Sequence, residues 1–186
     1  VTPTHGEAKV IETLLDFRAE ELLLIGSELA PQTLAEIGPR LPTVVIGRRI
    51  SATSLDVVRT ADGRGIGAVV DHLYELGHRH IVHVAAGAGV IAADRRNGYL
   101  RAMRRHALEA RARVIEGDFT EESGMAAAAE LLSDGCAPTA VVCANDRIAV
   151  GVIDTLRRSG VSVPEDISVT GYDDSALARL GHIDLT

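Results

Sequence analysis

The chain of 186 residues contains little cysteine, no long apolar run and fewer basic than acidic residues. Its two cysteines, Cys136 and Cys143, are not spaced as metal ligands, and Cys143 lies in an apolar run, which favours buried reduced thiols. No apolar run approaches the roughly 20 residues that a membrane-spanning helix needs, so we expect no membrane partner. The composition is that expected of a soluble, cytoplasmic α/β protein, and no signal peptide is visible. The net charge of −7 argues against nucleic-acid binding by this segment alone.

The chain instead contains short apolar strands that alternate with amphipathic helices. The predicted strands cover residues 22–25, 43–46, 57–58, 81–84, 114–115, 141–143 and 167–170. The predicted helices begin near Thr4, Pro31, Asp62, Val90, Thr120 and Asn145. Asp62 is expected to be the N-cap of its helix. The first helix carries an apolar stripe of Val10, Ile11, Leu14 and Leu15. This alternation predicts an α/β fold with mainly parallel sheets flanked by helices.

Polar side chains follow the ends of several predicted strands. Asn145 follows the strand at 141–143, and Asp173 follows the strand at 167–170. Arg95 and Phe119 come after two further strands. Ligands of open parallel sheets bind beyond the carboxyl ends of the strands. The four residues therefore predict a small-molecule pocket in which Arg95 binds hydroxyl or carboxylate groups and Phe119 stacks on a ring.

Each of these residues also has a purely structural interpretation. Asn145 has the residue type and position of a helix N-cap, and Asp173 could cap a loop. Arg95 could be an exposed arginine near a helix start, where positive charge is unfavourable. Phe119 could equally cover the cap of the next helix. Only their joint position at the strand ends favours a pocket.

Two other patterns suggest cofactors, but their spacing is wrong. Gly63, Gly65 and Gly67 lie between a strand and a helix but do not match a dinucleotide-binding loop, so close helix packing explains them better. The histidines at 78, 80 and 83 lack further ligands for a zinc site and are expected at the surface or at a strand edge. No strained turn presents a nucleophile, which argues against an enzyme, and we expect no cofactor or metal.

Several motifs occur in an order that resembles the LacI/GalR family of bacterial transcription regulators. They are DHL at 71–73, ELGHR at 75–79, DRRNGY at 94–99, GDFT at 117–120, AND at 144–146 and VPEDISVTGYDD at 163–174. The last motif is highly specific, and together they cover nearly the whole chain.

The resemblance implies a two-lobed, periplasmic-binding-protein-like effector domain. Residues 1–60 would form part of the N-terminal lobe, 61–182 the C-terminal lobe, and 183–186 the start of a return crossing. The DNA-binding headpiece and parts of the first lobe are expected to lie outside this chain, which would then be incomplete. Effector contacts of the family carry over to Arg95, Phe119, Asn145 and Asp173, and Gly47 and Arg48 match a first-lobe loop that faces the ligand.

By the same resemblance, the chain would be the sensing core of a homodimeric regulator. A small effector, a sugar or sugar derivative, would bind between the lobes and alter operator DNA binding through the headpiece. A soluble sugar-binding receptor of a transport system shares this fold and is the alternative; the upstream sequence distinguishes the two, by a helix-turn-helix segment or a secretion signal. An α/β enzyme is a more distant third.

Overall fold

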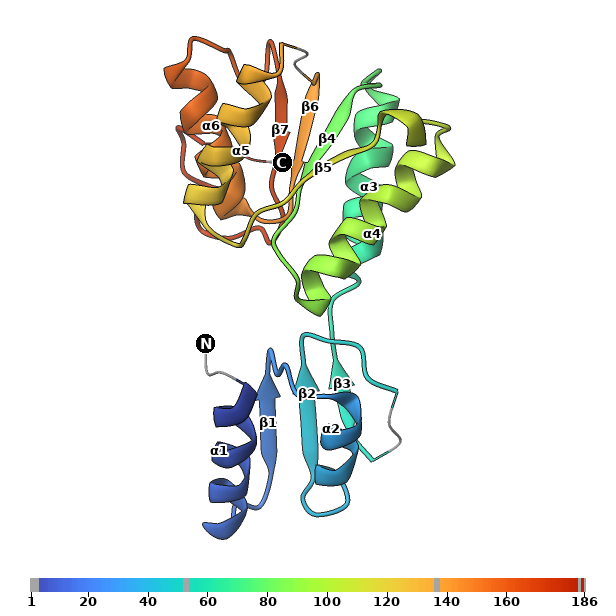
Figure 1. The fold of residues 1–186 in the computed structure, drawn as a ribbon, viewed down its shortest axis with the longest axis vertical. Helices are drawn as coiled ribbons and strands as arrows, with labels where there is room; N and C mark the ends of the chain where they lie inside the picture. The colour runs from blue at the N-terminus through green and yellow to red at the C-terminus, as the bar shows by residue number, and fades with distance from the viewer. Residues whose placement is uncertain (1–3, 52–53, 136–137, 184, 186) are drawn as a thin grey trace. The chain divides into compact units, whose positions relative to one another are not determined.

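The computed structural model describes residues 4–51, 54–135, 138–183 and 185. The chain divides into two compact units, residues 1–60 and residues 61–186. Both units consist of parallel strands with helices packed against them, as Figure 1 shows, so the predicted α/β class is confirmed. Among the described residues, no helix combines the length and apolarity that crossing a membrane requires.

The first unit is a three-stranded parallel sheet in the order β1-β2-β3 with two helices. Its elements are α1 (Thr4–Asp16), β1 (Leu22–Ile25), α2 (Pro31–Ile37), β2 (Thr43–Ile46) and β3 (Asp56–Val58). Pro31 starts α2 because a missing N–H costs nothing in the first helical turn. Ile11 of α1 and Leu34 of α2 are buried in one cluster with Val45 of β2, so both helices cover the same face of the sheet.

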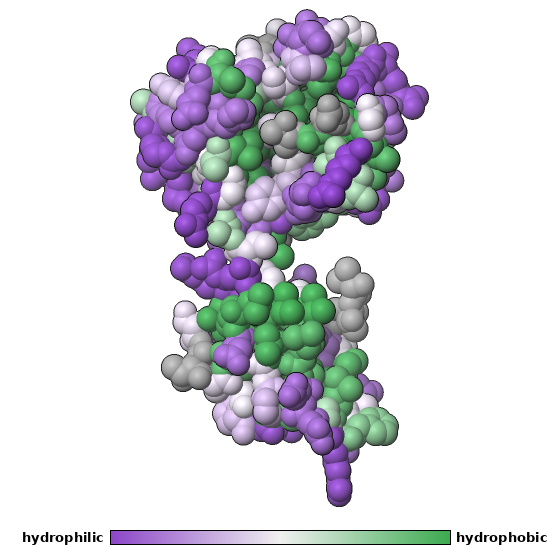
Figure 2. All heavy atoms as spheres, turned by 180° about the vertical axis from the view of Figure 1, so that it is seen from behind, coloured by the Kyte–Doolittle hydropathy of each residue, from purple (hydrophilic) through white to green (hydrophobic). Residues whose placement is uncertain are grey.

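The opposite face of this sheet is apolar and open. Leu23, Ile25 and Val58 point to it and are 58%, 74% and 57% exposed. In the parallel register Ile25 pairs with Ile46, which pairs with Val58, so these side chains form one continuous row. The apolar surface of this unit is visible in Figure 2. Parallel sheets are normally covered on both faces, and within the described residues this sheet is covered on one.

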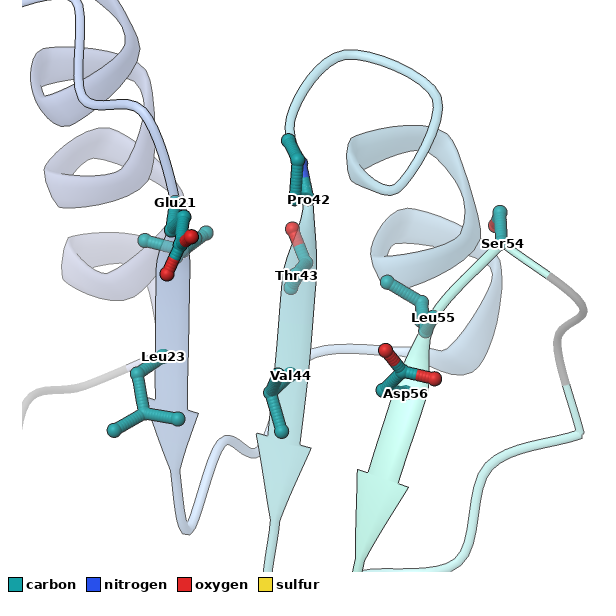
Figure 3. Close-up of a pocket in the computed structure, with 9 residues that line it drawn as sticks. Glu21, Leu23, Pro42, Thr43, Val44, Ser54, Leu55 and Asp56 are labelled. Atoms are coloured by element: carbon teal, nitrogen blue, oxygen red, sulfur yellow. The ribbon is translucent and has the colours of Figure 1, made fainter.

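A hollow of about 680 Å³ lies over the amino-terminal half of the same sheet. Leu23, Val44 and Asp56 line it from the three strands (Figure 3). It lies away from the carboxyl ends of the strands, where parallel sheets bind ligands, and we interpret it as part of the open face.

The apolar stripe predicted on the first helix is only partly correct. Ile11 is 2% exposed, but Val10 and Leu14 are 51% and 39% exposed. Helix α1 packs through a narrower line that consists of Ile11 with Ala8 and Leu15. Near the start of this helix, the Glu7 carboxylate accepts from the Glu28 N–H at 3.2 Å.

The second unit is a four-stranded parallel sheet in the order β5-β4-β6-β7. Its elements are α3 (Asp62–Glu75), β4 (Ile81–Val84), α4 (Val90–Arg105), a short 3-10 helix (Glu109–Arg111), β5 (Arg113–Ile115), α5 (Glu121–Ser133), β6 (Ala140–Cys143), α6 (Asp146–Arg158) and β7 (Ser168–Thr170). Helices α3 and α4 cover one face, and α5 and α6 cover the other (Figure 1). Two apolar cores result, one on each side of the sheet.

Glycine allows α3 and α4 to approach closely. A Cβ on Gly98 would lie 2.3 Å from the carbonyl oxygen of Gly63, and a Cβ on Gly65 would lie 2.6 Å from the hydroxyl of Tyr172. The helix-packing interpretation is therefore confirmed for Gly63, whereas Gly65 makes room for the Tyr172 ring that follows β7, and a Cβ on Gly67 would lie no closer than 3.9 Å to its neighbours.

The expectation of surface or strand-edge histidines is wrong for His83. This residue lies on β4 with no exposed surface, its Nδ1 is 2.8 Å from the Val142 carbonyl, and its ring stacks on Tyr99. Burial lowers its pKa to about 4, so the imidazole is neutral at pH 7. No cluster of metal ligands occurs among the described residues. Cys143 is a buried free thiol whose pKa is raised by burial, as expected, and Cys136 lies outside the described residues.

Candidate functional site

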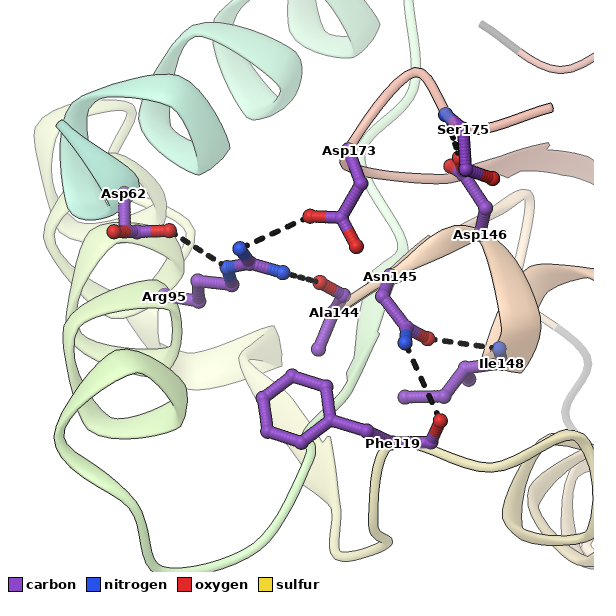
Figure 4. Close-up of polar contacts among 9 residues, drawn as sticks. All are labelled: Asp62, Arg95, Phe119, Ala144, Asn145, Asp146, Ile148, Asp173 and Ser175. Atoms are coloured by element: carbon purple, nitrogen blue, oxygen red, sulfur yellow. Dashed lines mark hydrogen bonds and ion pairs between the residues drawn. The ribbon is translucent and has the colours of Figure 1, made fainter. Parts of the chain in front are cut away.

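The second unit brings Arg95, Phe119, Asn145 and Asp173 together beyond the carboxyl ends of its strands (Figure 4). Arg95 lies on α4, which follows β4, and Phe119 lies between β5 and α5. Asn145 lies between β6 and α6, and Asp173 follows β7. Because all four strands run parallel, their carboxyl ends lie at one edge of the sheet, and the four residues meet there.

Arg95 is the centre of the cluster. Only 7% of the residue is exposed, although its side chain is charged. Its Nε donates to Asp62 Oδ1 at 2.9 Å, its Nη1 donates to the Ala144 carbonyl at 2.5 Å, and its Nη2 lies 3.1 Å from Asp173 Oδ1. Three different segments therefore fix the guanidinium, and the exposed-arginine interpretation is wrong.

Asp62 was predicted as the N-cap of α3, and this prediction is wrong. The N-cap is Ala61, and Asp62 is the first helical residue, 3% exposed. Its carboxylate instead pairs with Arg95, 33 residues further along the chain. The position still suits an acidic side chain, because the amino-terminal turn of a helix is positive.

Aromatic rings lie beside the guanidinium. Its central carbon is 4.0 Å from the ring centroid of Tyr172 and 5.9 Å from that of Phe119. Burial raises the pKa of Tyr172, and the nearby Asp62 carboxylate raises it further. Phe119 is 39% exposed, and its ring points toward Arg95 and Ala144 (Figure 4). The exposed ring is available for stacking, and sequence reasoning did not identify Tyr172 as part of the site.

Asn145 is a helix cap in this structure. Its Oδ1 accepts from the Ile148 N–H at 2.9 Å, and its Nδ2 donates to the Phe119 carbonyl at 3.3 Å. The first bond satisfies α6, and the second ties the loop after β5 to the end of β6. One N–H of the carboxamide remains beyond these two bonds, so the cap can also donate to a ligand.

Asp173 lies in an uncommon backbone conformation. Its φ is +113°, and Asp174 follows at +49°. The segment that follows these two residues is fixed by Asp146, which is 3% exposed and accepts from the Ser175 N–H at 2.7 Å. Burial raises the pKa of Asp173 above that of an ordinary aspartate; Arg95 opposes the shift, and Asp146 and Asp62 add to it. Its side chain remains 42% exposed, so it can still contact a ligand.

The chemical capacity of this edge is hydrogen bonding and stacking. Arg95 and Asn145 offer N–H donors, Asp173 offers a carboxylate acceptor, and Phe119 offers a ring face. A hydroxyl group can donate to a carboxylate and accept from a guanidinium at the same time, so vicinal hydroxyls fit this set.

The remaining two predicted site residues, Gly47 and Arg48, lie in the first unit. Gly47 follows β2 with a φ of +95°, a conformation that favours glycine, and its N–H donates to the Val58 carbonyl. Arg48 Nη1 donates to the carbonyls of Ser27 and Leu29 at 2.9 and 2.7 Å. These bonds tie the loop after β2 to the loop after β1, so both residues lie at the carboxyl edge of their own sheet.

Comparison with known proteins gives the family. A model of the periplasmic binding protein-like domain matches residues 70–186. The crystal structure of a LacI transcriptional regulator from a Rhodococcus species superimposes with a TM-score of 0.89 at 44% identity, over 100% of this chain and 69% of that one. The arabinose metabolism transcriptional repressor of Geobacillus stearothermophilus is 33% identical, over 78% of this chain and 42% of its own.

The ribose operon repressor of Haemophilus influenzae is 29% identical, over 96% of this chain and 56% of its own. The chain thus spans about half the length of the curated relatives that it matches. The residue motifs, the two parallel-sheet units and these matches agree, and the chain belongs to the LacI family of transcriptional regulators, with the periplasmic-binding-protein-like fold of their effector domains.

Proposed function

We propose that this chain is the ligand-sensing core of a transcriptional regulator, and that its effector is a sugar or sugar derivative. The observation that carries this proposal is the convergence of Arg95, Phe119, Asn145 and Asp173 at one sheet edge. The relatives named for arabinose metabolism and for the ribose operon support the sugar class. The same set of donors, acceptor and ring is what a polyhydroxyl ring requires.

The proposed mechanism is a shift between two arrangements of the protein. Residues 1–60 and 61–182 would act as two lobes, with 183–186 beginning a return crossing, and Gly47 and Arg48 would complete the effector site from the first lobe. An effector that binds one arrangement more tightly than another changes their populations by that difference in affinity. In a cytoplasmic homodimer this shift would alter how DNA-binding headpieces bind operator DNA. No catalytic step is part of the proposal.

Asp173→Asn in the full-length protein tests the ligand site. The substitution keeps the shape and removes the charge-assisted acceptor, so we expect sugar affinity to fall by about 1–3 kcal/mol in isothermal titration calorimetry. Asp174→Asn is the matched control, because Asp174 is 74% exposed in its side chain and pairs with Arg179 at the surface. Equal affinities of both variants and the parent would remove Asp173 from the site.

Operator binding tests the regulatory part of the proposal. We expect the full-length protein to bind DNA from its own promoter region in fluorescence anisotropy, and the effector to change that affinity. A protein that binds sugar but does not bind any such DNA would instead support a transport receptor.

A further inference from the structure

The charge of Arg95 is already compensated inside the protein. Its Nε contacts the carboxylate of Asp62 at 2.9 Å and its Nη2 contacts that of Asp173 at 3.1 Å. The side chains of Arg95 and Asp62 are 8% and 4% exposed, so solvent screens this pair weakly. Within the second unit, one positive charge therefore faces two negative charges before any ligand arrives.

The nearby charges increase this negative balance. Asp146, also buried, lies behind the same turn and holds the Ser175 N–H. The cations next in sequence, Arg96 and Arg147, point to the surface and pair with Glu116 at 2.6 Å and Glu121 at 3.5 Å. Both of these neighbouring cations therefore have their ion-pair partners at the surface and not among Asp62, Arg95 and Asp173.

From this charge balance we infer that the site selects an uncharged effector over its phosphorylated or carboxylate form, and that Asp62 is a residue that determines this selectivity. The inference rests on the proposed function, because it concerns the effector of the same site. It assigns to Asp62 a role that a helix cap does not have.

Hydrogen-bond geometry leads to the same class of ligand. An anionic group would have to displace Asp173 from the guanidinium to gain a bidentate contact, and it would then lie beside an unpaired carboxylate. A neutral hydroxyl needs no displacement, because it can donate to Asp173 and accept from an unused N–H of Arg95. Like charges placed side by side at an interface cost binding energy and reject the wrong partner.

Matched pairs of sugars test the inference in the full-length protein. The pairs are ribose with ribose 5-phosphate, arabinose with arabinose 5-phosphate and glucose with glucose 6-phosphate, measured by isothermal titration calorimetry. For the pair whose neutral member binds, we expect the phosphate to bind at least about tenfold more weakly. Asp62→Asn removes one negative charge with little change of shape. It should reduce the ratio of the affinity for the neutral sugar to the affinity for its phosphate by about threefold or more. Asp71→Asn, the control on the same helix, removes a charge that pairs with Arg105 and His106 away from the site and should leave the ratio unchanged.

The outcomes separate this inference from the proposed function. If neither member of any pair binds, the proposed sugar-sensing function is wrong and the inference fails with it. If the phosphate binds as well as the neutral sugar, the sensing function stands and the inference is wrong. If Asp62→Asn weakens both members equally, Asp62 only stabilises Arg95. Should this variant not fold, the same affinity ratio is measured with Asp173→Asn, which removes the other carboxylate that faces Arg95: the ratio narrows if charge sets it, and an unchanged ratio overturns the inference.

Discussion

Removal of Arg95 should destabilise the second unit, because the buried Asp62 carboxylate would then lose its ion pair with the guanidinium. The two side chains are 8% and 4% exposed and lie 2.9 Å apart. Breaking such a pair by removing one partner costs about 3–5 kcal/mol, whereas a surface pair contributes about 0–1 kcal/mol. We therefore expect Arg95→Met, which retains much of the side-chain volume, to lower the free energy of unfolding by about 3 kcal/mol or more.

The assay is urea unfolding of the full-length protein, monitored by hydrogen exchange of the amides in α3 and α4. The double variant Arg95→Met with Asp62→Asn should recover about 2 kcal/mol of the loss, because the buried charge is gone. Arg96→Met is the matched control, since Arg96 is 46% exposed in its side chain and pairs with Glu116 at the surface. A stability of Arg95→Met equal to that of the control would refute the reasoning, as would a double variant less stable than the single one.

Three further predictions concern packing, pH and stacking. Gly98→Ala should cost about 1–3 kcal/mol in urea unfolding, because its Cβ would lie 2.3 Å from the Gly63 carbonyl oxygen, whereas Gly181→Ala, with no neighbour within 4 Å, should unfold like the parent. His83 has a pKa lowered to about 4, so its contribution to the free energy of unfolding is complete above about pH 6.5. As the pH falls from 6.5 toward 4, about 3 kcal/mol of that free energy should be lost. His83→Leu should flatten the dependence of unfolding free energy on pH in this window, and an unchanged dependence would contradict the lowered pKa of His83. Phe119→Ala should reduce the thermal shift that a ring-shaped sugar induces, and an unaltered shift would show that the ring does not contact the ligand.

Local signals in the sequence predicted the strands and helices well. Apolar runs with β-branched residues predicted β4 and β6, which are buried along their whole length. Thr120 and Asn145 were predicted to start helices, and their side chains accept from the N–H groups of Ser123 and Ile148. Capping depends on residues three positions apart, so a single sequence contains the required information.

The partners of buried charges could not be predicted in this way. Asp62 has the residue type and position of an N-cap, and nothing local distinguishes a cap from a partner of Arg95. Their contact depends on the crossing of α3 and α4, which Gly63 and Gly98 allow. Similarly, the stripe on α1 predicted burial of Val10, but burial depends on which side of the helix faces the sheet. Both errors concern tertiary contacts between residues far apart in sequence.

The backbone at Asp173 affects how substitutions there must be interpreted. A non-glycine residue at a φ of +113° is held against its own preference by its surroundings, and Asp174 at +49° continues the distortion. Alanine at this position would retain the conformational cost and remove the contact with Arg95, whereas glycine would relieve that cost and so conceal part of the lost contact. A glycine replacement at this turn would therefore combine two opposite-signed effects in one number, and the length-preserving amide is the replacement that isolates the carboxylate.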